Sequence, residues 1–103
     1  MQRYPVRASH RPNLRPEALE PIARTHFDEA LREGDAVTTR FGAIARLSIR
    51  AEGRELGVEL AMDPKVSEEV ARETIARYNR FLEEVTGYSA KERAKRVRKS
   101  VSG

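Results

Sequence analysis

Residues 37–62, VTTRFGAIARLSIRAEGRELGVELAM, contain the clearest structural pattern in this chain. Apolar and polar side chains alternate through this stretch in three runs, and alternation with a period of two residues predicts β-strands. The runs cover residues 37–41, 45–51 and 55–62. Gly42 and the pair Glu52-Gly53 separate the runs, as expected for tight turns. The stretch therefore predicts an antiparallel sheet with one apolar face and one solvated face.

The charges of the second hairpin predict its register. When Arg50 is placed opposite Glu55, Arg46 falls opposite Glu59, so that opposite charges meet twice on one face. The same register pairs apolar residues on the other face, namely Ile49 with Leu56, Leu47 with Val58 and Ala45 with Leu60. A slip by one residue would destroy both sets of pairs, because it turns every side chain to the opposite face.

Upstream of this stretch, the sequence predicts one strand and one helix. Residues 2–8 alternate, and Pro5, which has no N–H group for a ladder, predicts a short strand or an edge strand. Residues 14–31 have apolar side chains at helical spacing, with two prolines in the first half. Because proline breaks the interior of a helix, the regular part of this helix is predicted to begin near residue 18.

Downstream, the clearest amphipathic helix follows Ser67, whose hydroxyl is suited to capping a helix start. Its apolar stripe consists of Val70, Ala71, Thr74, Ile75, Tyr78, Phe81, Leu82 and Val85. Gly87 is predicted to end the helix. Ser89 and Glu92 then form a capping-box pattern that opens a further helical stretch. We expect residues 90–100 to be only partly helical in the free protein, because short isolated helices are marginal in water.

These elements predict an α+β fold in the order β-α-β-β-β-α, followed by a basic, partly helical C-terminal tail. The helices would cover the apolar face of a mainly antiparallel sheet, which is a two-layer α/β sandwich. A chain of 103 residues suits one small domain. We assign residues 1–88 to this domain and residues 89–103 to the tail, which is expected to be partly helical or disordered.

The composition excludes several classes of protein. The chain has no cysteine, which excludes disulfides, thiolate metal sites and cysteine nucleophiles. No apolar run approaches the roughly 20 residues that a membrane span needs. The first ten residues, MQRYPVRASH, lack the apolar core of a signal peptide. We therefore expect a cytoplasmic protein without a membrane partner.

Positive charge is concentrated at the two ends of the chain. Residues 1–27 carry a net charge of +3 and residues 28–88 a net charge of −4, whereas residues 89–103 carry six cations against Glu92 alone. A cationic segment attached to a weakly acidic domain is typical of phosphate-binding arms, so the leading hypothesis is a small module that binds DNA or RNA weakly and electrostatically. The candidate nucleic-acid-binding residues are Lys91, Arg93, Lys95, Arg96, Arg98 and Lys99, with Arg3, Arg7 and Arg11 from the N-terminal end.

Two other functions stay open. A sheet edge or a helix surface could bind a protein partner or a second copy of the chain, because small sheets often leave an edge exposed. An enzyme is the third hypothesis, but no motif selects catalytic residues, metal ligands or a cofactor. The histidines His10 and His26 are too far apart in sequence to suggest a local pair of ligands. We therefore expect no catalytic activity, no metal and no cofactor.

One stretch resembles a known family. Residues 78–88, YNRFLEEVTGY, followed by Lys91-Glu92-Arg93, resemble an uncharacterised family of archaeal proteins of about this length. Compatible residues elsewhere are Phe41-Gly42-Ala43, Arg7 and Arg11. The resemblance implies a two-layer α/β sandwich with a flexible basic C-terminus, and it implies no activity. Within the stretch, Asn79 borders the buried face of its helix, where we expect its amide to bond a loop or the sheet edge.

Overall fold

The computed structural model describes residues 1–102, with side chains from Met1 to Arg96. The elements are β1 (Gln2–Pro5), the 3-10 helix η1 (Ala8–Asn13), α1 (Pro16–Phe27), β2 (Leu31–Glu33), β3 (Ala36–Phe41), β4 (Ile44–Glu52), β5 (Glu55–Met62), α2 (Glu68–Thr86) and α3 (Ala90–Ser102). Over the described residues, five antiparallel strands form one sheet in the order β1-β5-β4-β3-β2.

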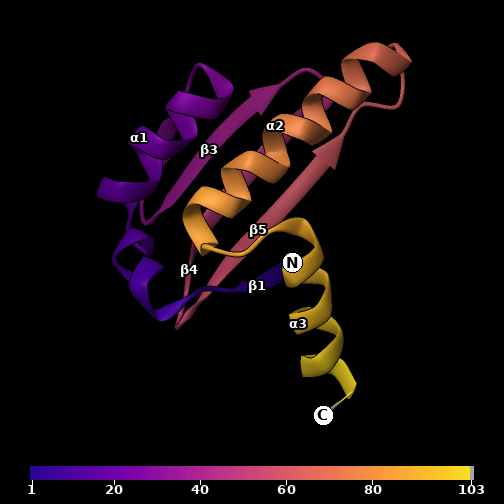
Figure 1. Cartoon of the computed structure of the whole chain (residues 1–103). Helices are drawn as coiled ribbons and strands as arrows, with labels where there is room; N and C mark the ends of the chain where they lie inside the picture. The colour runs from indigo at the N-terminus through magenta and orange to yellow at the C-terminus, as the bar shows by residue number, and fades with distance from the viewer. Residues whose placement is uncertain (103) are drawn as a thin grey trace.

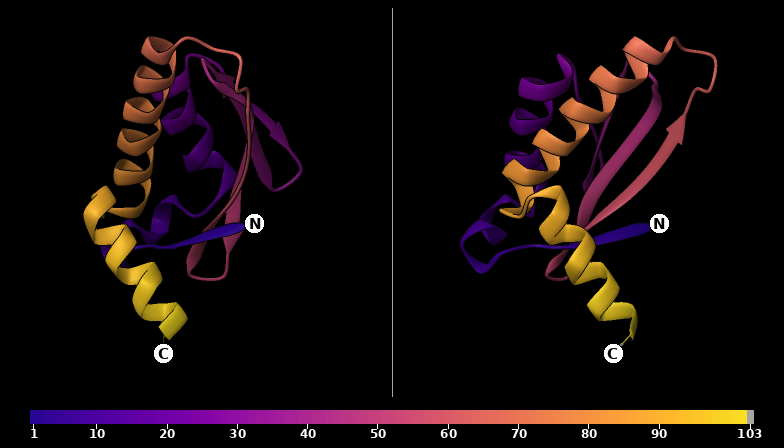
Figure 2. Two further views of the ribbon diagram at one scale, coloured as in Figure 1. Left: turned by 90° about the vertical axis from the view of Figure 1, so that its right-hand side faces the viewer. Right: turned by 45° about the vertical axis from the view of Figure 1, so that its right-hand side comes forward.

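The helices α1 and α2 cover the same face of this sheet (Figure 1). Figure 2 shows the sheet nearly edge-on, with both helices on one side of it. The fold is thus the predicted two-layer α/β sandwich. Pro5 lies in β1 at one edge of the sheet, as its missing N–H group predicts.

The core lies between the sheet and the helices. From the sheet, the alternating residues Leu47, Ile49, Leu56 and Val58 are buried, as predicted. From the helices, the fully buried side chains include Leu19, Phe27, Phe81, Leu82 and Val85. The rings of Phe27 and Phe81 pack with their centroids 5.1 Å apart, which joins α1 to α2 over the sheet.

The predicted register of the β4–β5 hairpin is wrong by two residues. Ile49 lies opposite Val58 rather than Leu56, and Arg50 lies opposite Gly57 rather than Glu55. The remaining predicted partners change in the same way, so that Leu47 lies opposite Leu60 and Arg46 opposite Ala61. Each residue keeps its face of the sheet, because the shift is an even number of residues.

The turn explains this shift. Glu52 pairs with Glu55, so the two-residue loop is Gly53-Arg54, and Gly53 has a φ of 64°. Hairpin loops of this length need a positive φ at their first central position, where glycine is favoured. The predicted register would have put Glu52 at that position. Instead, Glu52 accepts a hydrogen bond from Arg50 on its own strand over 2.7 Å.

The prediction that Ala45 faces the core is also wrong, because β4 contains a register shift. The pairing with β5 is irregular between Ile44 and Arg46, and Ile44 rather than the predicted Ala45 is buried. Arg46 forms its ion pair with Glu33 of β2 over 3.6 Å instead of facing Glu59. The bulged position lets the larger apolar side chain enter the core.

The N-terminal third of the chain differs most from prediction. The strand ends at Pro5 and is followed by η1, which was not predicted. The helix α1 begins at Pro16 and ends at Phe27, and the next residue, Asp28, adopts a left-handed conformation with a φ of 69°. Leu31 was assigned to the apolar stripe of this helix, but it lies in the unpredicted strand β2 and is 67% exposed. The left-handed residue stops the helix before Leu31.

The ends of α2 follow the sequence prediction. The hydroxyl of Ser67 accepts a hydrogen bond from the N–H group of Val70, and Gly87 ends the helix with a φ of 78°. The predicted apolar stripe is only partly correct, because Ile75 is 52% exposed. Beyond the helix, α3 runs continuously away from the body of the molecule (Figure 1). Partial helicity of residues 90–100 in solution stays a prediction.

Candidate nucleic-acid interface

The N-terminal segment closes the C-terminal end of α2. The N–H group of Arg7 donates to the carbonyl of Thr86 over 2.8 Å, and its Nε donates to the carbonyl of Gly87 over 3.2 Å. The side-chain amide of Asn13 donates to the carbonyl of Val85 over 3.2 Å. These carbonyls lack donors within the helix. The last turn of α2 has no basic residue of its own, so Arg7 supplies the cation that the negative helix end favours.

Gly87 is required at this junction for two reasons. Its positive φ is unfavourable for other residues. In addition, a Cβ atom at this position would lie 2.7 Å from Nδ1 of His10, which is closer than packed atoms approach. His10 of η1 therefore packs directly on the end of α2.

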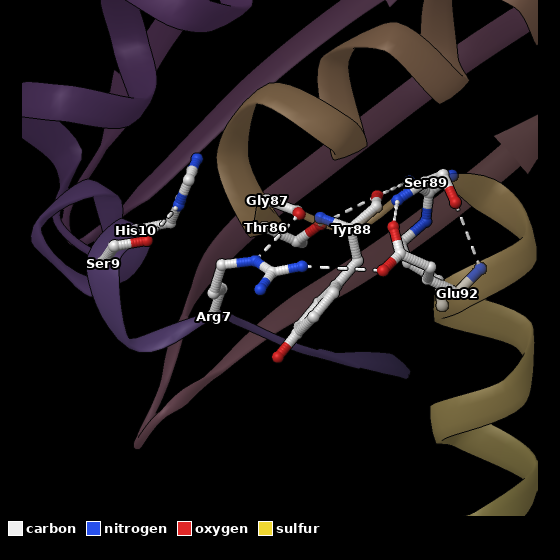
Figure 3. Close-up of polar contacts among 9 residues, drawn as sticks. Arg7, Ser9, His10, Thr86, Gly87, Tyr88, Ser89 and Glu92 are labelled. Atoms are coloured by element: carbon white, nitrogen blue, oxygen red, sulfur yellow. Dashed lines mark hydrogen bonds and ion pairs between the residues drawn. The ribbon is translucent and has the colours of Figure 1, made fainter.

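The guanidinium groups of Arg7 and Arg96 both lie over the ring of Tyr88. The Cζ atoms of these arginines are 4.6 Å and 4.3 Å from the centroid of the ring, and only 8% of Tyr88 is exposed. Figure 3 shows Arg7 beside the ring, with its contacts to Gly87 and Glu92. Cation–π contacts of this kind attract both arginines to the tyrosine ring. The ring therefore links the N-terminal segment to α3.

The predicted capping box starts α3. Glu92 Oε1 accepts from the N–H group of Ser89 over 3.0 Å, and Ser89 Oγ accepts from the N–H group of Glu92 over 3.2 Å (Figure 3). The other carboxylate oxygen of Glu92 is 3.5 Å from Arg7. The hydrogen bonds from Ser89, helped by the charges of Arg7 and Arg96, lower the pKa of Glu92 below its ordinary value.

Arg93 points into the protein rather than toward solvent. Its side chain donates to the carbonyl of Tyr88 over 2.7 Å and to Oδ1 of Asn79 over 2.9 Å, and only 3% of the residue is exposed. The guanidinium lies 5.8 Å from the ring of Tyr4 in β1. Burial lowers the pKa of Arg93 and raises that of the neighbouring Tyr78. Asn79 therefore bonds α3, and not the loop or sheet edge that we expected.

The other cations of α3 point outward. Lys91, Lys95 and Arg96 are exposed, and they form no ion pair with any side chain from Met1 to Arg96. Lys91 and Lys95 are one helical turn apart and share a face of α3. The candidates Arg98 and Lys99 lie outside the described side chains.

The three N-terminal arginines are not equivalent. Arg7 joins the cations of α3 through Tyr88, as described above. Arg3 alternates with Tyr4 in β1, and because Tyr4 faces α3, Arg3 lies on the opposite face of the sheet. Arg11 is exposed on η1. Arg7 therefore lies beside the exposed cations of α3, whereas Arg3 lies on the other face of the sheet.

The two histidines make packing contacts. The ring of His26 in α1 stands edge-on to Phe81, and its Nε2 is 2.8 Å from a carboxylate oxygen of Glu84. His10 lies against Gly87, with Nδ1 2.9 Å from Oγ of Ser9. Within the described part of the chain, no three side chains of the metal-binding types form a group that could hold an ion. No helix found there is long and apolar enough to cross a bilayer.

Comparison with known families decides the relationship that the stretch of residues 78–88 suggested. A family model described as "Domain of unknown function (DUF5611)" matches residues 1–99. The chain belongs to this family. The chain is also similar to the NMR solution structure of hypothetical protein TA0095 from Thermoplasma acidophilum. The two are 29% identical with a TM-score of 0.61, and the match covers 94% of this chain and 97% of the other. A comparison with curated proteins gave no match.

In this DUF5611 chain, the residues that carry the resemblance meet at one junction. Asn79 and the carbonyl of Tyr88 hold Arg93, while Gly87 admits the ring of His10. Glu92 caps α3 and pairs with Arg7. The inward orientation of Arg93 was not predictable from the sequence, because its partner Asn79 is 14 residues away and no local pattern connects the two.

Proposed function

We propose that this protein binds nucleic acid weakly and without sequence specificity, through the phosphate groups. The observation that carries the proposal is the set of exposed cations on α3, Lys91, Lys95 and Arg96, which form no ion pair with any described carboxylate. Cations of this kind gain affinity for a phosphate backbone by releasing its condensed counterions.

The attachment of α3 supports the proposal. Arg93 and Tyr88 hold the first turn of the helix against β1 and α2, so the neighbouring cations need less ordering when they bind. Arg7 lies beside Arg96, since the two guanidinium groups share the Tyr88 ring, and its own charge is paired with Glu92. Arg93 has no place in the contact surface, because its side chain is buried and bonded.

The test measures fluorescence anisotropy of labelled single- and double-stranded DNA and RNA at several salt concentrations. The full chain is compared with the double variant Lys91→Gln/Lys95→Gln. The matched control is Lys65→Gln/Arg72→Gln, which removes the same charge from the region around the start of α2. For double-stranded DNA, each lost phosphate contact reduces the log–log salt slope by about 0.9.

We expect the α3 variant to bind more weakly with a smaller salt slope, and the control to match the original protein. If the original protein binds none of the four nucleic acids at low salt, the proposal is wrong. It is also wrong if the control loses as much affinity as the α3 variant, since net charge alone would then explain binding. A protein partner is the second candidate, favoured by an open edge of the sheet.

A further inference from the structure

Half of β5 has no strand on its outer side. β1 pairs only with residues Glu55–Val58, so among the described residues Glu59–Met62 pair with β4 alone. Figure 1 shows β5 running past the N-terminal end of β1 toward the start of α2. An exposed stretch of this kind offers backbone N–H and C=O groups to another extended chain.

A hollow lies where the open edge begins. It has a volume of about 480 Å³, and its walls include Tyr4 of β1, Leu60 of β5 and Tyr78 of α2. Leu60 faces α2, because it shares the face of the buried residue Val58 two positions earlier. A residue opposite Leu60 in an added strand would point to the same side. The hollow, whose walls also include Met1 and Gln2, adjoins the position where such a strand would place that side chain.

The side of the edge that faces α2 is apolar and exposed. Leu60 and Met62 are 42% and 45% exposed, and Ile75 of α2 is 52% exposed. Ile75 lies one helical turn before Tyr78 on the same side of the helix. Exposed apolar side chains gathered beside an open strand are typical of an interaction site.

The other side of the edge is acidic. The β5 positions that face away from the helices are Glu55, Gly57, Glu59 and Ala61, followed by Asp63. Glu59 is exposed and pairs with no cation among the described side chains. An incoming strand with basic residues on this side would meet complementary charge.

The same acids argue against a second copy of the chain as the occupant. With Ala61 opposite Ala61 about a two-fold axis, Glu59 of one copy would face Asp63 of the other, and like charges repel. With Leu60 opposite Leu60, Met62 would fall opposite Val58, whose outer side β1 already covers.

We propose that Glu59–Met62 bind an extended peptide segment of another protein as an added strand. Apolar side chains of the segment enter the space beside Leu60, Met62 and Tyr78, and alternating lysine or arginine side chains face Glu59. The hollow adjoins the buried Arg93 of α3 through Tyr4 and Tyr78. The proposal does not depend on nucleic-acid binding.

The test uses the full chain and a fluorescein-labelled peptide, Lys-Val-Arg-Val-Lys-Val-Arg. A peptide with glutamate at every basic position is the charge control. The double variant Leu60→Lys/Met62→Lys places cations on the apolar side of the edge. The matched control is Leu31→Lys, an exposed apolar residue on the other edge strand, β2.

We expect saturable binding of the basic peptide and protection from amide exchange at residues 59–62. The edge variant binds at least about tenfold more weakly, equivalent to the loss of roughly 1.4 kcal/mol, and Leu31→Lys is unchanged. The proposal fails if the basic peptide does not bind, if the acidic peptide binds equally, or if Leu31→Lys is equally impaired. It also fails if edge protection rises with protein concentration without peptide, because a second copy would then be the occupant.

Discussion

The guanidinium of Arg93 donates a hydrogen bond of 2.9 Å to the side-chain oxygen of Asn79, and this contact ties the start of α3 to α2. A residue from the most basic segment of the chain thus acts as a packing residue. The same contact fixes the start of α3, whose Lys91, Lys95 and Arg96 are exposed. Stability and proposed binding therefore depend on neighbouring residues of one helix.

Replacing Asn79 by alanine should destabilise the protein. The variant leaves the buried Arg93 guanidinium without one acceptor, which costs about 1–3 kcal/mol of unfolding free energy. Urea denaturation followed by circular dichroism measures the change. The control is Arg80→Ala, an exposed neighbour on α2, where we expect a change within about 0.5 kcal/mol. Equal stability of Asn79→Ala and the original protein would contradict this role.

Gly87→Ala should destabilise the junction through both backbone strain and crowding. The left-handed conformation costs a non-glycine residue about 1–2 kcal/mol, and the new Cβ also meets the ring of His10. The double variant Gly87→Ala/His10→Ala removes the crowding but keeps the strain. Thermal and urea unfolding should therefore show that His10→Ala is less harmful in the Gly87→Ala background than alone. If the double variant loses the sum of the unfolding free energies that the two single variants lose, crowding between the new Cβ and His10 is ruled out.

Thr74 should be sensitive to loss of its hydroxyl. Its Oγ1 accepts from the N–H group of Ala43 over 2.9 Å and donates to the carbonyl of Val70 over 2.7 Å, and the residue is buried. Thr74→Val leaves the Ala43 donor unpaired, at a cost of about 1–3 kcal/mol. Thr74→Ser keeps the hydroxyl and should lose less stability in the same urea experiment. A valine variant as stable as the original protein would contradict this role of the hydroxyl.

The contribution of Glu92 should depend on pH. Its pKa in the folded protein lies below the ordinary value of 4.5, so its stabilising effect is fully present above that value. The effect is lost as the pH falls through the lowered folded-state pKa. We expect the difference in unfolding free energy between the original protein and Glu92→Gln to shrink over this acidic range. Stability curves from pH 7 to pH 2 measure it, and a constant difference would contradict the hydrogen bonds to Ser89.

The sequence predicted those parts of the fold that neighbouring residues determine. Alternation identified β3, β4 and β5, and Ser67 and Gly87 marked the ends of α2. The capping box of Ser89 and Glu92 was also predictable. Each of these features depends on hydrogen bonds or backbone conformations within a few residues, so a local pattern suffices.

The register of the hairpin and the roles of the cations depend on contacts that form only in the folded chain. Charge pairs worth a fraction of a kcal/mol favoured one register, but the positive φ required in the loop selected Gly53 and moved every pair. Arg93 turned inward because Asn79 and Tyr88 were brought to it by folding, while Lys91 and Lys95 stayed outside. Contacts between distant parts of a chain acquire their energy only when packing brings them together, and no local pattern contains that information.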